Sequence, residues 1–140
     1  MVMEQLAVEI VGLCREYGEC RVEAERMEEA RRVKNALESV CAMARQRLDI
    51  SDPALLLALL DACEVTRDEG MLQEVLDVVG RNLDRLAVSA ESVKLLACCY
   101  YYVEEEECVE RAGRMLEELR KMGRGEEELA DVETILEELT

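Results

Sequence analysis

Apolar residues recur every three to four positions along most of this chain, which is the spacing of amphipathic helices. The pattern predicts about seven helices and no strand. We expect six of them over residues 3–17, 22–48 (with a break near Glu25), 53–66, 71–86, 108–122 and 126–139. The remaining helix follows Ser89 and contains residues 95–103. The fold class is therefore predicted to be all-α.

Two stretches are apolar on all sides and should be buried on most of their surface. Residues 95–103 contain no charge, so this stretch is expected to be a central helix. Residues 55–60 are Leu-Leu-Leu-Ala-Leu-Leu and predict a second buried helix. A helix that is apolar all round needs neighbours on several faces, so the fold should be organised around these two helices.

Cap residues mark where the helices should begin and end. Asp52 is a good N-cap, and Pro53 follows at the first helical position, where its missing N–H costs nothing. Ser89 is expected to cap the central helix. Gly18 should end the first helix, and Gly123-Arg124-Gly125 should end the sixth, because glycine adopts the left-handed conformation cheaply.

A repeat is found when residues 51–88 are laid over 89–125. Each segment has a polar cap, a strongly apolar helix, an acidic turn and an amphipathic helix. Apolar positions of the second helices match at a constant offset of 37 residues. Residues 1–50 are interpreted as a degenerate first hairpin and residues 126–140 as a capping helix, all within a single domain of residues 1–140.

The repeat resembles the tetratricopeptide-like superfamily of helical hairpins. The best local match is Leu96-x-x-Cys99-Tyr100 followed by the segment Cys108–Leu119, and Asp52-Pro53 resembles the proline-marked junction between repeats. The usual Trp is absent, and the second turn lacks its Gly. The resemblance implies a right-handed array of antiparallel hairpins with a C-terminal capping helix. The ending of residues 116–123 is also similar to pentatricopeptide repeats, which bind RNA through basic surfaces.

The charge balance argues against that RNA-binding branch. The formal net charge is −16, with 33 acidic and 17 basic residues, and more than half of the excess lies in the last 40 residues. Such a field repels phosphate backbones and favours basic partners. We expect no nucleic-acid partner and a protein partner that is basic. The apolar stretches are too short to span a bilayer, so no membrane association and a cytoplasmic location are expected.

Seven cysteines are many for a chain of this size, yet no C-x-x-C occurs and histidine is absent. Most of them fall on predicted apolar faces, where a free thiol packs as a small hydrophobe. The alternative is disulfide formation, as in hyperthermophile proteins, with Cys63 paired to Cys98 or Cys99, or Cys14 paired to Cys41. Adjacent helical residues point about 100° apart, which disfavours a bond between Cys98 and Cys99.

Catalytic signatures are missing, so the protein is predicted not to be an enzyme and to need no cofactor or metal. There is no histidine base, and the three lysines have no partner pattern. No phosphate-binding glycine motif or calcium loop occurs. The run Glu104–Glu107 offers four carboxylates, but successive helical residues point in different directions, so a solvated turn is the better interpretation.

Tyr100, Tyr101 and Tyr102 are the candidate binding residues. Three successive helical positions span about 200° of the circumference, so they cannot all face one neighbour. Tyrosine buries a large area at low entropic cost and is favoured at interfaces. Our hypothesis is a non-catalytic protein-interaction module whose buried helices line a concave surface, with Tyr101 and Tyr102 as anchors. The alternatives are tyrosines that only complete the edge of the core, and a structural bundle that forms a homodimer through the apolar stripes of its first or last helix.

Overall fold

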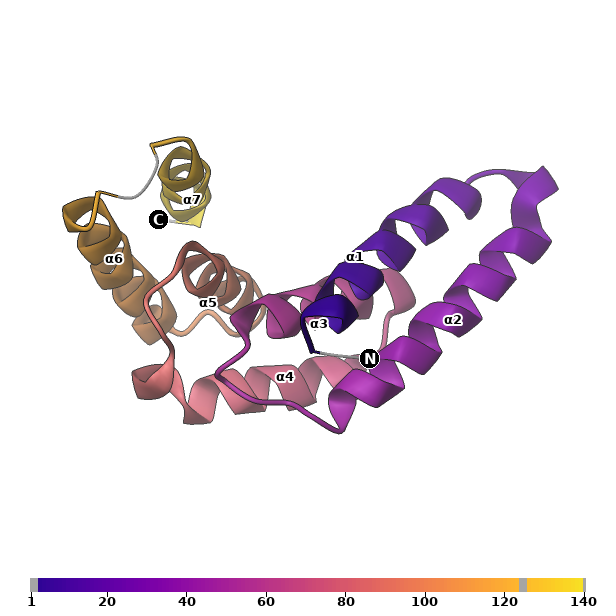
Figure 1. The fold of residues 1–140 in the computed structure, drawn as a ribbon, viewed down its shortest axis with the longest axis horizontal. Coiled ribbons are helices and arrows are strands. Elements are labelled where there is room, and N and C mark those ends of the chain that lie inside the picture. The colour runs from indigo at the N-terminus through magenta and orange to yellow at the C-terminus, as the bar shows by residue number, and fades with distance from the viewer. Residues whose placement is uncertain (1–2, 124–125, 140) are drawn as a thin grey trace. The chain divides into compact units, whose positions relative to one another are not determined.

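The computed structural model describes residues 3–123 and 126–139, and this part of the chain is all-helical without strands (Figure 1). The α-helices are α1 (Met3–Cys20), α2 (Met27–Arg45), α3 (Pro53–Thr66), α4 (Glu69–Arg81), α5 (Ala90–Val103), α6 (Glu106–Lys121) and α7 (Glu126–Leu139). Two short 3-10 turns, η1 (Ala24–Arg26) and η2 (Leu83–Arg85), interrupt the series. The predicted all-α class is confirmed, and the break near Glu25 coincides with η1.

The chain divides into two compact units, Met1–Val75 and Leu76–Thr140. In the first unit α1 packs against both α2 and α3, and α2 also contacts α3 (Figure 1). Its core contains Leu6 and Ile10 from α1, Leu37 from α2, and Leu56 and Leu59 from α3. Leu6, Ile10 and Leu37 belong to the apolar stripes that the sequence pattern predicts, whereas Met27, expected in the stripe of the second helix, is exposed.

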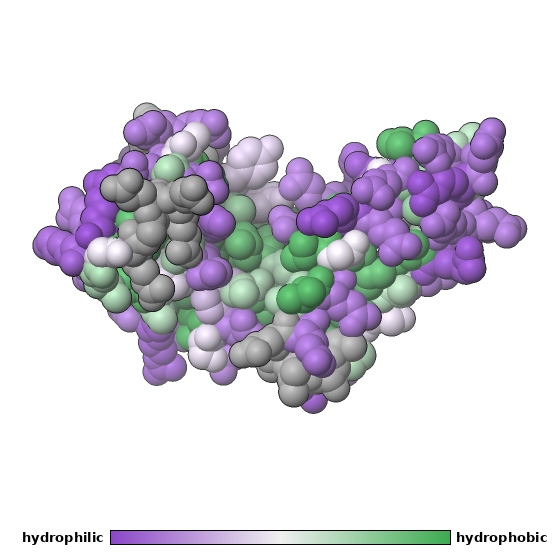
Figure 2. Space-filling model, turned by 45° about the horizontal axis from the view of Figure 1, so that its top comes forward, coloured by the Kyte–Doolittle hydropathy of each residue, from purple (hydrophilic) through white to green (hydrophobic). Residues whose placement is uncertain are grey.

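Hydrophilic residues predominate on the surface where α1 and α2 connect. In Figure 2 the surface at the connected ends of α1 and α2 is mainly purple, with a smaller green group. Val22 and Met27 are the exposed large apolar residues at this connection. Arg26 makes two ion pairs here: its Nε donates to Glu29 Oε2 at 2.9 Å, and its Nη1 donates to Glu23 Oε2 at 3.4 Å.

The second unit is organised around α5, which contacts both α6 and α7, and α6 and α7 also contact each other. Leu95, Leu96 and Cys99 are buried, as expected for a central helix. On the other helices the buried positions include Ala112 and Met115 of α6, and Leu129, Val132 and Leu136 of α7. Tyr101 and Val103 are exposed, so the last turn of α5 is only partly covered by the core.

The predicted 37-residue offset is found in the helix boundaries. Pro53–Thr66 and Ala90–Val103 are both 14-residue helices whose first and last positions differ by 37, and α4 and α6 begin at positions that also differ by 37. The left-handed residues that close α3 and α5, Arg67 (φ 58°) and Glu104 (φ 52°), show the same offset. Both repeats therefore stop their first helix at the same point and in the same way.

The N-caps explain why these helices begin where they do. Asp52 Oδ1 accepts a hydrogen bond from the Leu55 N–H at 3.2 Å, with Pro53 next to it in the first turn. Ser89 Oγ accepts from the Ser92 N–H at 3.1 Å. These side chains satisfy backbone donors that no helical carbonyl can reach, so the two caps are confirmed in the roles predicted for them.

Several predicted boundaries are wrong by a few residues. Gly18 does not end the first helix, because α1 continues to Cys20, whose side chain is fully buried. The second helix stops at Arg45 instead of Leu48, and the fourth at Arg81 instead of Leu86. Burial of Cys20 outweighs the tendency of glycine to break the helix.

The end of α6 follows the prediction as far as the structure describes it. The helix closes at Lys121, and Gly123 follows in the left-handed conformation with φ 69°. The other two residues of the predicted stop, Arg124 and Gly125, lie outside the described residues. No helix in the described ranges is both long and apolar enough to cross a membrane.

Candidate functional site

The three tyrosines lie in the last turn of α5, and the structure separates them by exposure. Tyr101 is 69% exposed, whereas Tyr100 and Tyr102 are half-buried. This difference follows from the 100° rotation between successive helical residues. Tyr101 is therefore the member of the trio that solvent reaches most freely.

Tyr101 and Tyr102 form an aromatic pair. Their ring centroids are 5.3 Å apart and their planes meet at 87°, which is an edge-to-face arrangement. This geometry brings the positive edge of one ring to the negative face of the other and is favourable for aromatic rings. The pair presents a preformed aromatic surface, to which the 41% exposed Val103 adds an apolar neighbour in the chain.

The four carboxylates that follow this surface are all exposed. Glu104 closes α5 in the left-handed conformation, Glu105 is the N-cap of α6, and Glu106 and Glu107 lie in its first turn. Negative charge near a helix N-terminus is favoured by the helix dipole. We call Tyr101–Glu107 the tyrosine–acid surface.

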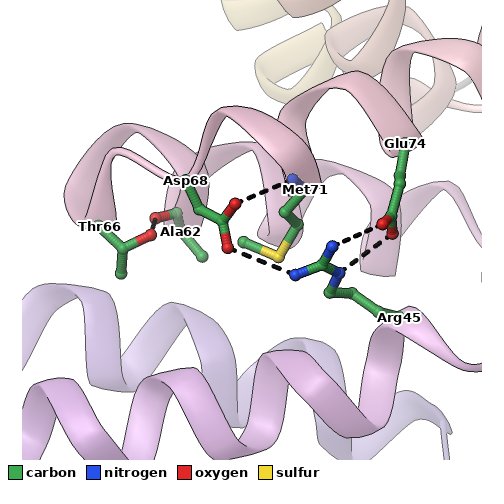
Figure 3. A network of polar contacts seen from close by, with 6 residues as sticks. All are labelled: Arg45, Ala62, Thr66, Asp68, Met71 and Glu74. Atoms are coloured by element: carbon green, nitrogen blue, oxygen red, sulfur yellow. Dashed lines mark hydrogen bonds and ion pairs between the residues drawn. The ribbon is translucent and has the colours of Figure 1, made fainter.

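A second polar feature lies in the first unit, where Arg45 at the end of α2 meets the start of α4. Its guanidinium holds Glu74 through two bonds, Nε to Oε2 at 3.0 Å and Nη2 to Oε1 at 2.5 Å. Its Nη1 donates to Asp68 Oδ2 at 3.4 Å. Figure 3 shows the carboxylates of Asp68 and Glu74 directed toward the Arg45 guanidinium. The hydrogen bond from Arg45 lowers the pKa of Glu74 and raises that of Arg45.

Asp68 has a structural role besides this ion pair. Its Oδ1 accepts from the Met71 N–H at 3.0 Å and so caps α4 (Figure 3). Glu105, the counterpart of Asp68 at the offset of 37, makes no such side-chain cap bond. The same carboxylate therefore starts α4 and ties it to α2 in the first unit.

A cavity of about 370 Å³ opens beside this network. Its lining combines residues of α2 with residues around the turn between α3 and α4: Glu38, Cys41, Ala42, Arg45, Thr66, Asp68 and Met71. The volume is within the range of small-molecule sites. Of these residues the sequence singled out only Cys41, as a disulfide candidate. No local motif could have found the set, because its members come from segments more than 20 residues apart.

All seven cysteines, each within the described ranges, are free thiols. Burial, reinforced by neighbouring thiols and acids, raises the pKa of Cys41 and Cys63 to about 12. Burial likewise raises the pKa of Cys99 to about 12 and that of Cys14 to about 11. Because the thiolate is the reactive form, these four cysteines are poor nucleophiles at neutral pH and serve the packing.

The described residues contain no group of three or more cysteine and carboxylate side chains placed to hold a metal ion. Comparison of the chain with protein-family models, with curated proteins and with solved structures found no significant match.

Proposed function

We propose that this protein is a non-catalytic interaction module that binds a basic segment of a protein partner. Tyr101 and Tyr102 would anchor the segment, and the carboxylates of Glu104–Glu107 would select its positive charge. The observation that carries the proposal is the exposed edge-to-face pair of Tyr101 and Tyr102 directly before four exposed acids.

The aromatic pair supports an anchoring role on energetic grounds. An exposed tyrosine that becomes buried removes on the order of 100 Å² of surface from water, which is about 2 kcal/mol of binding free energy. The pairing of Tyr101 with Tyr102 restricts both rings before binding, which lowers the entropic cost of ordering them. Residues of this kind are frequent among the few that dominate binding energy at protein interfaces.

The chemistry of the surface favours arginine and lysine in the partner. A guanidinium or ammonium group is attracted to the face of a tyrosine ring, and carboxylates next to the ring add charge complementarity. The chain already contains one such contact, in which the Arg21 guanidinium carbon lies 5.8 Å from the ring centroid of Tyr17. The net charge of −16 would also speed the encounter with a basic partner.

The proposal extends to the architecture. We interpret the two repeats, residues 51–88 and 89–125, as tetratricopeptide-like hairpins, a class of repeat that presents surfaces to peptides. The matching ends of α3 and α5 and the matching starts of α4 and α6 support this interpretation.

The test is a calorimetric titration of the full chain with a short arginine-rich peptide. An acidic peptide of equal length serves as the ligand control. We expect Tyr101→Ala to weaken binding by about tenfold or more, in line with the loss of a buried aromatic anchor. The matched control Tyr17→Ala, which removes a half-buried tyrosine from α1, should leave the affinity within twofold. Equal affinity of the wild type and Tyr101→Ala would contradict the proposal.

A homodimer is the second candidate. The exposed apolar residues of α1 indicate which face of this helix would form the dimer interface. The apolar stripes expected to pair across a two-fold axis are buried inside their own units, at Leu6 and Ile10 of α1 and on α7. Val8 and Val11, one turn apart on the other side of α1, are 74% and 39% exposed. Light scattering at high concentration should show a dimer that Val8→Glu dissociates if this face pairs, and a monomer otherwise.

A further inference from the structure

The cavity beside Arg45 lies entirely within the first unit and is separate from the tyrosine–acid surface. Its lining carries three charged side chains, namely Glu38, Arg45 and Asp68. Arg45 is already balanced by two carboxylates, because it is paired with both Glu74 and Asp68. The carboxylate of Glu38 has no ion pair or hydrogen bond within the described ranges, so the local charge is negative.

The hydrogen-bonding groups of the lining are mainly acceptors. The Thr66 hydroxyl donates its proton to the Ala62 carbonyl at 2.8 Å, which leaves the lone pairs of Oγ1 free (Figure 3). The Met71 N–H is used by Asp68, and Arg45 directs three of its five N–H groups to carboxylates. Glu38, which is exposed, and the half-buried Thr66 and Asp68 therefore line the cavity with unused acceptor capacity.

The other lining residues, Ala42, Met71 and Cys41, are apolar, and two of them contain polarisable sulfur. Ala42 contributes a methyl group, and Met71 contributes a thioether that is almost completely buried. The Cys41 side chain is 4% exposed, lines the cavity and makes no hydrogen bond within the described part of the chain. Its sulfur is a weak acceptor that a donor entering the cavity could satisfy.

A ligand for this cavity needs positive charge, several donors and a short apolar body. We propose that the cavity binds the ammonium group of an aliphatic amine. The ammonium would donate to Glu38, Thr66 and Asp68, and the methylene chain would lie against Ala42 and Met71. Such a group belongs to free polyamines and also to lysine side chains. The inference does not depend on the proposed function, since it concerns a different unit of the molecule.

The experiment is an amide chemical-shift titration of the full chain with butylammonium. Two analogues of similar size separate the possible causes of binding: butyltrimethylammonium keeps the charge but has no N–H donor, and butyrate reverses the charge. We expect saturable shifts centred on residues 38–45 and 66–71. Butyltrimethylammonium should bind at least tenfold more weakly, and butyrate should not bind.

Charge-matched variants separate a site from general attraction by an acidic protein. Glu38→Gln should weaken butylammonium binding by about tenfold, whereas Glu117→Gln, an exposed acid on α6, should change it by less than twofold. Thr66→Val should weaken it by about threefold, which is the range for a neutral hydrogen bond. Tyr101→Ala should leave it unchanged, so failure of the proposed function would be seen separately.

Three results would overturn the inference. These are equal binding of the trimethylated analogue, equal effects of Glu38→Gln and Glu117→Gln, and shifts spread over acids throughout the chain. If the inference holds, titrations with diaminobutane and with Nα-acetyl-lysine amide identify the source. Tighter binding of the diamine indicates a free polyamine, and tighter binding of the lysine derivative indicates a protein side chain.

Discussion

Replacing Asp68 tests whether one carboxylate starts α4 and ties it to α2. Asp68→Ala removes the cap bond to the Met71 N–H at 3.0 Å and the ion pair with Arg45 at 3.4 Å. Loss of an N-cap costs about 1 kcal/mol, and a half-exposed ion pair adds at most about 0.5 kcal/mol. We therefore expect a loss of about 1–1.5 kcal/mol in the free energy of unfolding.

Urea unfolding followed by far-UV circular dichroism measures this loss. For a slope of about 2 kcal/mol per M, the midpoint should fall by roughly 0.5–0.75 M. Asp68→Asn keeps a good capping side chain and removes only the charge, so it should cost less than about 0.5 kcal/mol. Glu105→Ala, at the equivalent position of the second repeat, should also be nearly neutral because Glu105 makes no cap bond.

Two results would refute the reasoning on Asp68. If Asp68→Asn is as costly as Asp68→Ala, the ion pair and not the cap carries the effect. If Glu105→Ala is as costly as Asp68→Ala, the difference between the two repeats has no energetic meaning.

Other predictions concern the core, the ion pair and the thiols. Leu59→Ala should cost about 2–5 kcal/mol in urea unfolding because Leu59 is fully buried, and the half-buried Leu57→Ala should cost clearly less; equal losses would contradict the described orientation of α3. The pKa of Glu74 is lowered in the folded state from its ordinary value of 4.5. Its pair with Arg45 therefore stabilises the protein fully at pH values above 4.5, and this stabilisation is lost as the pH falls through the lowered pKa. The stability difference between wild type and Glu74→Gln should therefore be present at pH 7 and vanish in acid, and a constant difference would argue against the pair. Mass spectrometry after iodoacetamide treatment at pH 8 should find Cys98 modified before Cys41, whose pKa of about 12 and burial protect it; the reverse order would contradict the packing.

The features that could be predicted from the sequence are those with local causes. Asp52 and Ser89 cap their helices because each cap bond spans only three residues, so their chemistry is visible in the sequence. The constant offset of 37 predicted where α5 and α6 begin relative to α3 and α4. The unequal exposure of Tyr100 and Tyr101 follows from helix geometry alone.

The features that could not be predicted depend on contacts between distant segments. Gly18 remains helical because Cys20 is buried by tertiary packing, which local propensity does not report. The network of Arg45 with Asp68 and Glu74 joins residues 23 and 29 positions apart. Nothing in the sequence around Arg45 distinguishes it from the other arginines of α2, so the cavity beside it becomes visible only when α2 and α4 are placed together.

The most direct test of the interaction role is to map where a basic peptide binds on the chain. Amide chemical shifts of the full chain, recorded while an arginine-rich peptide is added, report the position of contact residue by residue. The proposal predicts that the largest shifts fall within Tyr101–Glu107. It also predicts that Tyr101→Ala weakens binding, so that these shifts no longer saturate at the peptide concentrations that saturate the wild type. Largest shifts at any other segment, with residues 101–107 unperturbed, would contradict it.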